Sequence, residues 1–289
     1  MVRCLINSQA HYMSNTTSIN KYKIPGYSQL FLETTCGLSC KNCCVFDYKG
    51  TDATIGLRRM TISNTRDFLV KMREKGIGFT RLVTLGGEPT LNPDFKEISY
   101  MLRNEFSDLY DDNVCHTNGC NLTSDVIEGL SMYDAIHISI YPSNIDIHNT
   151  LINSDAIKYL RTHNTNVIFK MYTKKRFFAY GEKRSGFTYD ENNWDRCPIK
   201  NQCQYIHDGN IYGCNLLFAE KREPCNLMTS TVQEIHDYFE RESGYEMCKT
   251  CWQPAKEVAV LPNKPEIDKS TVTAGLKLIS LWNKPNKII

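Results

Sequence analysis

The sequence predicts an α/β protein in which a partial (β/α)6 TIM-like barrel precedes a small, cysteine-rich α+β domain. Two observations indicate this fold class. From about residue 25 to residue 175, short apolar runs alternate with segments of helical periodicity, which is typical of a parallel sheet with right-handed crossovers. Beyond about residue 190 the alternation stops and cysteines become frequent. Five or six strand–helix units fall short of a closed eight-fold barrel, so a partial barrel is expected.

The same patterns divide the chain into four parts. Residues 1–24 are polar and rich in Asn, Ser and Thr, and we expect a flexible N-terminal segment there. Residues 25–190 are expected to form the barrel, residues 191–255 the cysteine-rich domain and residues 256–289 a C-terminal tail. The boundary after the barrel is placed in a long polar stretch that Lys174-Lys175-Arg176 opens.

Each barrel element follows from a local pattern of apolar residues. The expected strands are Leu30–Leu32, Arg81–Leu85, Val114–Thr117, Ala135–Tyr141 and Val167–Tyr172. The expected helices are Ile62–Lys75, one beginning at Asn92-Pro93, Ser124–Met132 and Asp155–His163. The first helix has Phe68, Leu69 and Met72 on one face and Gly76 as its stop, and in the second a cap residue precedes a proline. These periodicities define the core-facing side of each helix.

The cysteine-rich part contains two clear local signals. Tyr205–Tyr212 reads as a β-hairpin because Asp208-Gly209 is a favoured tight turn between two short apolar runs. A helix over Val232–Phe239 is expected, since Thr231 and Glu234 have the spacing of a capping box.

Composition narrows the function classes. The chain has 289 residues, of which 41% are hydrophobic, and a net charge of +2, so there is no basic footprint for nucleic acid. Thirteen cysteines, an odd number, without an apolar leader at the N-terminus argue against a secreted disulfide framework. No apolar run reaches membrane-spanning length, so no membrane partner is expected. We therefore expect a cytoplasmic protein.

Cys36, Cys40 and Cys43 form a CxxxCxxC motif directly after the first expected strand. Three thiolates within eight residues can ligate three irons of a [4Fe-4S] cluster and leave the fourth iron open to a small molecule. A zinc knuckle is the alternative reading of such spacing. The motif lies at the strand end where chemistry occurs on barrel scaffolds.

This motif resembles that of the radical S-adenosylmethionine (SAM) superfamily. The resemblance implies that the open iron binds SAM, which is reductively cleaved to a 5′-deoxyadenosyl radical that abstracts a substrate hydrogen. Leu85-Gly86-Gly87-Glu88-Pro89 resembles the family's Gly-Gly-Glu motif, which implies that Glu88 binds the SAM ammonium and that Gly86 and Gly87 line the ligand. Further SAM contacts implied by position are Asn118, Ser139 and Lys170.

One position departs from the family pattern. The family usually has an aromatic residue just before the third cysteine, packing on the adenine, and this chain has Asn42 there. Cys44 adjoins the motif and is read as a small buried residue.

A second cysteine group resembles the SPASM/Twitch extensions of radical SAM enzymes. Gly209 is followed after four residues by Cys214, the extension's Gly-x4-Cys element. The resemblance implies an auxiliary [4Fe-4S] cluster held by Cys197, Cys214, Cys248 and Cys251. A tetrathiolate zinc site is the alternative, Cys203 is an alternative to Cys197, and Cys225 has no assigned role. Cys115, Cys120, His116 and His207 are read as ordinary structural or polar residues.

The layout looks most like that of the Twitch-containing radical SAM aminocyclitol dehydrogenases. This favours oxidation of a small sugar- or cyclitol-like alcohol, with the auxiliary cluster as electron acceptor and a flavodoxin- or ferredoxin-type protein as electron donor. The alternatives are a radical SAM peptide maturase and a non-enzymatic zinc- or cluster-binding interaction protein. Oxidation needs a general base, and the sequence leaves Tyr141, His148, Glu182 and Asp190 open.

Overall fold

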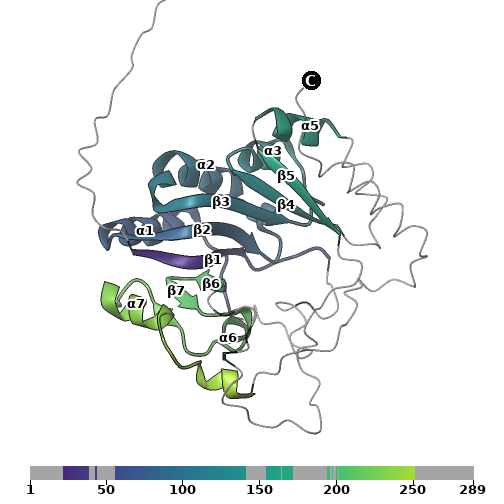
Figure 1. Cartoon of the computed structure of the whole chain (residues 1–289). Helices are drawn as coiled ribbons and strands as arrows, with labels where there is room; N and C mark the ends of the chain where they lie inside the picture. Colours follow the sequence, from purple (N-terminus) through teal and green to yellow (C-terminus); the bar gives the residue numbers. More distant parts are fainter. Residues whose placement is uncertain are drawn as a thin grey trace, which may run out of the picture.

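A computed structural model of the chain describes residues 22–38, 43, 56–140, 154–163, 165–171, 194–195, 197, 200 and 202–250, with only the backbone of residues 170, 171 and 250. This part of the chain is built on an eight-stranded mixed sheet (Figure 1). Its strands are β1 (Tyr22–Glu33), β2 (Ile77–Gly86), β3 (Tyr110–Thr117), β4 (Ala135–Ile140), β5 (Asn166–Met171), β6 (Cys203–His207), β7 (Asn210–Tyr212) and β8 (Cys225–Asn226). Its α-helices are α1 (Ile62–Glu74), α2 (Phe95–Glu105), α3 (Ser124–Leu130), α5 (Asp155–Thr162), α6 (Asn215–Glu220) and α7 (Val232–Phe239). Its 3₁₀ helices are η1 (Pro89–Leu91), η2 (Ser107–Leu109) and η5 (Glu246–Thr250).

The strands β1 to β5 form a parallel sheet. They lie in chain order, and each is hydrogen-bonded in parallel to the next. Their carboxyl ends therefore all lie at one edge, as the sequence predicted for the catalytic edge of a barrel-like sheet. The full order is β5-β4-β3-β2-β1-β6-β7-β8, which is an open row in the described residues. The α/β class is confirmed, and the curvature of a partial barrel remains a prediction.

The main apolar core lies between one face of this sheet and the helices α1, α2, α3 and α5 (Figure 1). Alternate strand residues such as Leu32, Leu82 and Ile136 point to these helices, as expected for a period of two. Phe68 and Leu102 are among the helix residues that meet them. The predicted apolar face of the first helix is confirmed.

The opposite face of the sheet, which we call the inner face, has a second and smaller apolar cluster. It comprises Phe31, Val83, Leu85, Val114, Ala135, Tyr205 and Phe218. Phe218 belongs to α6 and packs against Phe31, with ring centroids 4.9 Å apart. Short α6 thus covers the inner face beside β1 and β6, while the rest of the cluster comes from alternate positions of the strands.

The predicted hairpin is confirmed, but it also extends the main sheet. β6 and β7 pair antiparallel around the Asp208-Gly209 turn, where both residues have positive φ. β6 also pairs in parallel with β1, so that Tyr205 lies opposite Gln29. The hairpin, which was expected in the cysteine-rich domain, therefore continues the parallel sheet beyond its first strand.

Several boundaries differ from the prediction, and β2 and β3 each begin four residues before the expected strand. β1 begins at Tyr22, inside the segment expected to be flexible, because Ile24 is fully buried and pairs with Phe79. The second helix begins at Phe95 rather than at Asn92-Pro93, because Asn92 accepts from the backbone N of Asp94 at 2.8 Å and forms a turn before the helix. The capping box of Thr231 and Glu234 at the start of α7 is confirmed.

Candidate metal and cofactor site

The residues predicted to bind SAM lie along the carboxyl edge of the parallel strands. Cys36 follows β1, Gly86–Glu88 ends and follows β2, and Asn118 follows β3. Ser139 and Lys170 are register partners near the ends of β4 and β5. Because neighbouring parallel strands end side by side, these five sites are brought to one edge by the topology alone.

The carboxylate of Glu88 is buried and accepts hydrogen bonds from the two loops around it. Oε1 accepts from the backbone N and Oγ1 of Thr90, at 3.2 and 2.7 Å, and from Oγ1 of Thr117 at 2.7 Å. Oε2 accepts from the backbone N of Asn118 at 2.7 Å. Burial raises the pKa of Glu88, although these hydrogen bonds act in the opposite direction. The side chain thus ties two loops together, and Oε2 has room for one further donor.

The turn Thr117-Asn118-Gly119 links Glu88 to the cysteine motif. Thr117 Oγ1 also accepts from the backbone N of Gly119 at 3.0 Å, and Gly119 has a φ of 69°, which favours glycine. Asn118 Nδ2 donates to the sulfur of Cys36 at 3.9 Å. A polar chain therefore runs from Glu88 through Asn118 to Cys36.

The glycines of the motif bring β2 close to β1. A Cβ on Gly86 would lie 2.5 Å from the carbonyl O of Glu33. Gly87 N donates to that same oxygen at 2.7 Å, and Glu88 N donates to the carbonyl O of Thr35 at 2.8 Å. Position 86 thus requires glycine because the backbone of Glu33 lies so close to it. That Gly86 and Gly87 line a ligand remains a prediction.

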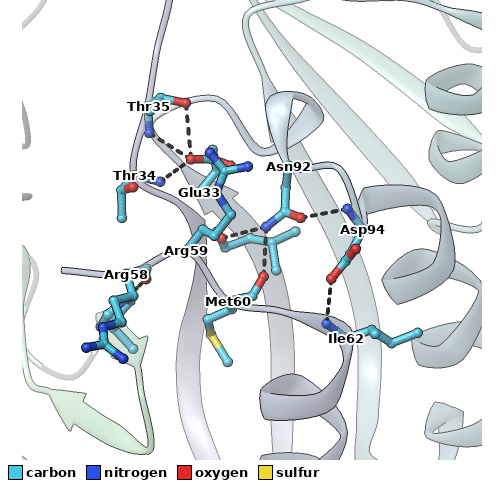
Figure 2. Close-up of polar contacts among 11 residues, drawn as sticks. Glu33, Thr34, Thr35, Arg58, Arg59, Met60, Ile62, Asn92 and Asp94 are labelled. Atoms are coloured by element: carbon cyan, nitrogen blue, oxygen red, sulfur yellow. Dashed lines mark hydrogen bonds and ion pairs between the residues drawn. The ribbon is translucent and has the colours of Figure 1, made fainter.

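Glu33, which sequence reasoning missed, ends β1 just before the cysteine motif (Figure 2). Its side chain is fully buried, and Oε1 accepts from the backbone N of Thr34 and Thr35, at 2.8 and 3.0 Å, and from Thr35 Oγ1 at 3.1 Å. Arg59 Nε lies 3.6 Å from Oε2. The signal available in the sequence is a carboxylate at the end of an otherwise apolar strand.

The two ends of the segment that contains the cysteine motif are fastened together. Met60 N donates to the carbonyl O of Leu32 at 3.0 Å. The side chain of Asn92, which is buried, donates to the carbonyl O atoms of both Leu32 and Met60, at 2.9 and 2.8 Å (Figure 2). The side-chain amide of Asn92 therefore bonds to a residue before the motif and to a residue after it.

Two of the three predicted iron ligands can be placed. Cys43 packs against the apolar cluster of the inner face, and Cys36 lies near both Cys43 and Glu88. Burial raises the pKa of Cys36, and the negative charge of Glu88 and Cys43 adds to that effect. Bound metal cations would offset the cost of burying these negative charges, so the thiolates of Cys36 and Cys43 suit a metal cluster. Cys40 lies outside the described residues.

A second feature that the sequence reasoning missed is a pair of histidines on the inner face. His116 and His137 are register partners on β3 and β4, and His116 Nε2 lies 2.8 Å from His137 Nδ1. They follow Val114 and Ala135 of the inner apolar cluster by two residues, which places them on the same face. An imidazole pair of this kind can accept a proton or pass it on.

Three of the four predicted auxiliary ligands, Cys197, Cys214 and Cys248, interact electrostatically with one another. Burial raises the pKa of Cys214 to about 12, and the neighbouring Cys248 and Cys197 contribute. Burial and Cys197 likewise raise the pKa of Cys248. Cys203 interacts electrostatically with Cys197, so it also lies close to the group. Cys251 lies outside the described residues.

The surroundings of Cys214 are closely packed. Cys214 is the N-cap residue of α6, and the nearby backbone N–H groups of Leu216 and Leu217 act against the effect of burial on its pKa. Gly213 has no room for a side chain, because a Cβ would collide with the hydroxyl of Tyr245. The guanidinium of Arg241 lies 4.0 Å from the ring centroid of Tyr245, and Trp194 meets the same ring edge to face. A buried thiol close to backbone N–H groups and to an aromatic wall suits an iron–sulfur cluster.

No three His, Cys, Asp or Glu side chains of the described residues are arranged to hold a single metal ion. In an iron–sulfur cluster, by contrast, each thiolate binds a different iron.

No helix in the described part of the chain is long and apolar enough to span a membrane.

The remaining predicted residues divide into structural ones and ones outside the described part. Cys115 and Cys225 are buried in the main core, and Cys120 is exposed. His207 donates from Nε2 to the carbonyl O of Arg58 at 2.7 Å, as expected for an ordinary polar residue. The following lie outside the described residues: Asn42, Cys44, Tyr141, His148, Glu182, Asp190 and the side chain of Lys170.

Comparison with known proteins shows similarity in fold. No protein-family model matches the sequence, and no curated protein matches it significantly. Among solved structures, SuiB of Streptococcus suis bound to its precursor peptide SuiA aligns with a TM-score of 0.52 and 12% identity, over 77% of this chain and 66% of SuiB. BtrN in complex with AdoMet and 2-DOIA aligns with a TM-score of 0.51 and 15% identity, over 76% of this chain and 84% of BtrN.

SuiB bound to S-adenosylmethionine aligns similarly, with a TM-score of 0.50 and 12% identity over 78% of this chain and 68% of SuiB. The chain spans just under two thirds of the SuiB chain in its complex with the peptide. The described part of the chain has the fold of SuiB and BtrN, two proteins whose structures were solved with S-adenosylmethionine bound.

Proposed function

We propose that the protein is a radical SAM enzyme. The observation that carries this proposal is the polar chain from Glu88 through Asn118 to Cys36, at the carboxyl edge of the parallel sheet. It connects the Gly-Gly-Glu motif, the Thr117-Asn118-Gly119 turn and the cysteine motif, which are far apart in the sequence. Such a connection is expected where the three act on one ligand. The fold shared with SuiB and BtrN supports the same function.

In this proposal Cys36, Cys40 and Cys43 hold the SAM-binding [4Fe-4S] cluster. When bound, such a cluster supplies the electron that cleaves SAM. Glu88 fixes the loops after β2 and β3, and the remaining acceptor direction of its Oε2 is suited to the ammonium of SAM. Ser139 and Lys170 are proposed as further SAM contacts because they lie near the ends of the next two strands along the edge.

We assign Cys197, Cys214, Cys248 and Cys251 to an auxiliary [4Fe-4S] cluster, which would accept an electron from a substrate radical. The favoured reaction is oxidation of a small sugar- or cyclitol-like alcohol, with a flavodoxin- or ferredoxin-type protein as the electron donor for SAM cleavage. The alcohol loses a hydrogen atom from carbon, then one electron, and a proton from its hydroxyl. The imidazoles of His116 and His137, on the inner face, are suited to accept that proton.

Peptide maturation is the second candidate. It is favoured by the similarity to SuiB, whose structure was solved with a precursor peptide. The two candidates share the SAM chemistry and differ in the substrate.

Anaerobic reconstitution of the full chain with iron and sulfide tests the shared chemistry. After addition of dithionite and SAM, we expect 5′-deoxyadenosine, and we expect its formation to stop when Cys36 is replaced by Ala. The Cys225→Ala variant is the matched control because Cys225 is a core residue. A protein that folds with zinc alone and never forms 5′-deoxyadenosine would be an interaction protein instead.

Isotope transfer separates the two substrate classes. Cyclitols and aminocyclitols deuterated at the carbinol carbon are compared with deuterated peptides. Deuterium in 5′-deoxyadenosine from the alcohols alone supports the dehydrogenase, and deuterium from the peptides alone supports the maturase.

A further inference from the structure

We propose that Glu33 and Arg59 form a latch that holds Thr34 and Thr35, and with them Cys36, in place before any metal is bound. The inference rests on the proposed function only in that Cys36 is a ligand of the SAM-site cluster. Neither residue belongs to a motif of the proposed site.

The first half of the latch is the carboxylate of Glu33. Its Oε1 accepts three hydrogen bonds from Thr34 and Thr35, the two residues directly before Cys36. Because Glu33 itself is fully buried at the end of a paired strand, these bonds fix the direction in which the chain leaves β1. Cys36 is the next residue after them.

The second half of the latch is Arg59. Glu33 Oε2 is buried, and no described residue donates a hydrogen bond to it. The guanidinium of Arg59, with Nε at 3.6 Å, supplies the counter-charge that a buried carboxylate requires (Figure 2). Arg59 follows the cysteine motif in the sequence and precedes Met60, whose backbone N donates to the carbonyl O of Leu32 in β1.

The pair therefore joins by charge a residue before the cysteine motif to a residue after it. The backbone bond from Met60 to Leu32 and the amide of Asn92 bring these two parts of the chain together. Glu33 and Arg59 add a contact that depends on side-chain chemistry, so it can be removed without deleting the backbone pairing. A Cys36 that is already held in place is ready for its iron, and the entropy of ordering it is then not lost at the moment of binding.

The test is the rate at which Cys36 is alkylated by iodoacetamide in the metal-free full chain, followed by peptide mass spectrometry. Cys225, buried in the core, is the internal reference in the same molecule. We expect Glu33→Gln to accelerate alkylation of Cys36 roughly tenfold, because an amide group then faces the guanidinium in place of a carboxylate. We expect Arg59→Gln to accelerate it about threefold, since the arginine is 45% exposed and its contribution is screened.

Two further variants distinguish positioning from a general loss of stability. Arg59→Lys keeps the charge and should restore a rate within about twofold of the wild-type rate. Arg58→Gln is the matched control, because Arg58 is exposed and no ion pair of its side chain occurs in the described part of the chain. It should leave the rate unchanged.

The proposal is overturned if Arg59→Gln alkylates like the wild type, if Arg58→Gln behaves like Arg59→Gln, or if Arg59→Lys fails to restore the rate. If Glu33→Gln also exposes Cys225, that variant has lost its fold, and the arginine variants alone decide. The readout needs no cluster and no SAM, so a protein that never forms 5′-deoxyadenosine would refute the proposed function and leave this test intact.

Discussion

Replacement of Glu88 by Gln should destabilise the metal-free protein because it breaks the link between the loops after β2 and β3. An amide oxygen can take over the three hydrogen bonds that Oε1 accepts. The amide nitrogen then faces the backbone N–H of Asn118, which now bonds to Oε2 at 2.7 Å. A buried N–H without an acceptor costs about 1–3 kcal/mol. A loss of unfolding free energy in the middle of that range should lower the melting temperature by roughly 4–8 °C.

Thermal unfolding followed by circular dichroism measures this loss, with Glu97→Gln as the matched control. Glu97 is an exposed carboxylate on α2, so its replacement should leave the melting temperature within about 1 °C of the wild-type value. The variant should also loosen Asn118 and thereby the contact from Asn118 to Cys36. If Glu88→Gln is as stable as Glu97→Gln, the carboxylate does not hold the two loops and the reasoning is refuted.

Three further predictions concern the pH dependence, the iron content and the packing of the auxiliary site. Because burial raises the pKa of Glu88, the folded state binds the carboxyl proton more tightly than the unfolded state does. The free energy of unfolding of the wild type should therefore fall, relative to that of Glu88→Gln, as the pH rises from the ordinary carboxyl pKa through the raised one. Urea titrations from about pH 4 to about pH 8 measure this difference, and a difference that stays constant with pH would contradict the prediction. Cys36→Ser and Cys214→Ser should each lower the iron content of the reconstituted protein by about four atoms per chain, whereas Cys225→Ser should leave it unchanged; equal iron in all three would rule out two separate clusters. Gly213→Ala should destabilise the protein by about 1–3 kcal/mol, because the new Cβ collides with the hydroxyl of Tyr245, while Gly37→Ala, with nothing within 4 Å of the new atom, should not; chemical denaturation measures both.

The fold was predictable where the pattern of apolar residues is decided locally. The helix over Asp155–His163 and the strand with Ile136, Ile138 and Ile140 have clean periods, and both are found within a residue of their predicted ends in the described part of the chain. The start of β1 was missed because Tyr22 to Gly26 contains a proline and a glycine and looks like a loop. Its pairing with β2, which buries Ile24, is a long-range contact that no local pattern contains.

The site was predictable to the extent that its residues stand in motifs. Cys36, Glu88 and Asn118 were selected from short sequence motifs, and the structure links them through hydrogen bonds. Glu33 and the pair His116–His137 were not selected, since single polar residues at strand positions carry no motif. Only the parallel register between β3 and β4 places the two histidines side by side. The position of β6 beside β1 was equally hidden, because a hairpin signal says nothing about what the hairpin pairs with.

The pairing of β6 with β1 has a consequence for the proposed chemistry. It brings Phe218, one turn after Cys214, into the same apolar cluster against which Cys43 packs. In that inner cluster the rings of Phe31, Tyr205 and Phe218 lie 4.9 to 6.3 Å apart. Cys214 and Cys248 themselves pack against the main core on the other side of the sheet. A packed apolar cluster excludes water, and a radical formed next to it would be protected from side reactions with solvent. Because β6 pairs with β1, both cysteine groups adjoin one continuous sheet, and this is the physical reason to propose that they serve one reaction.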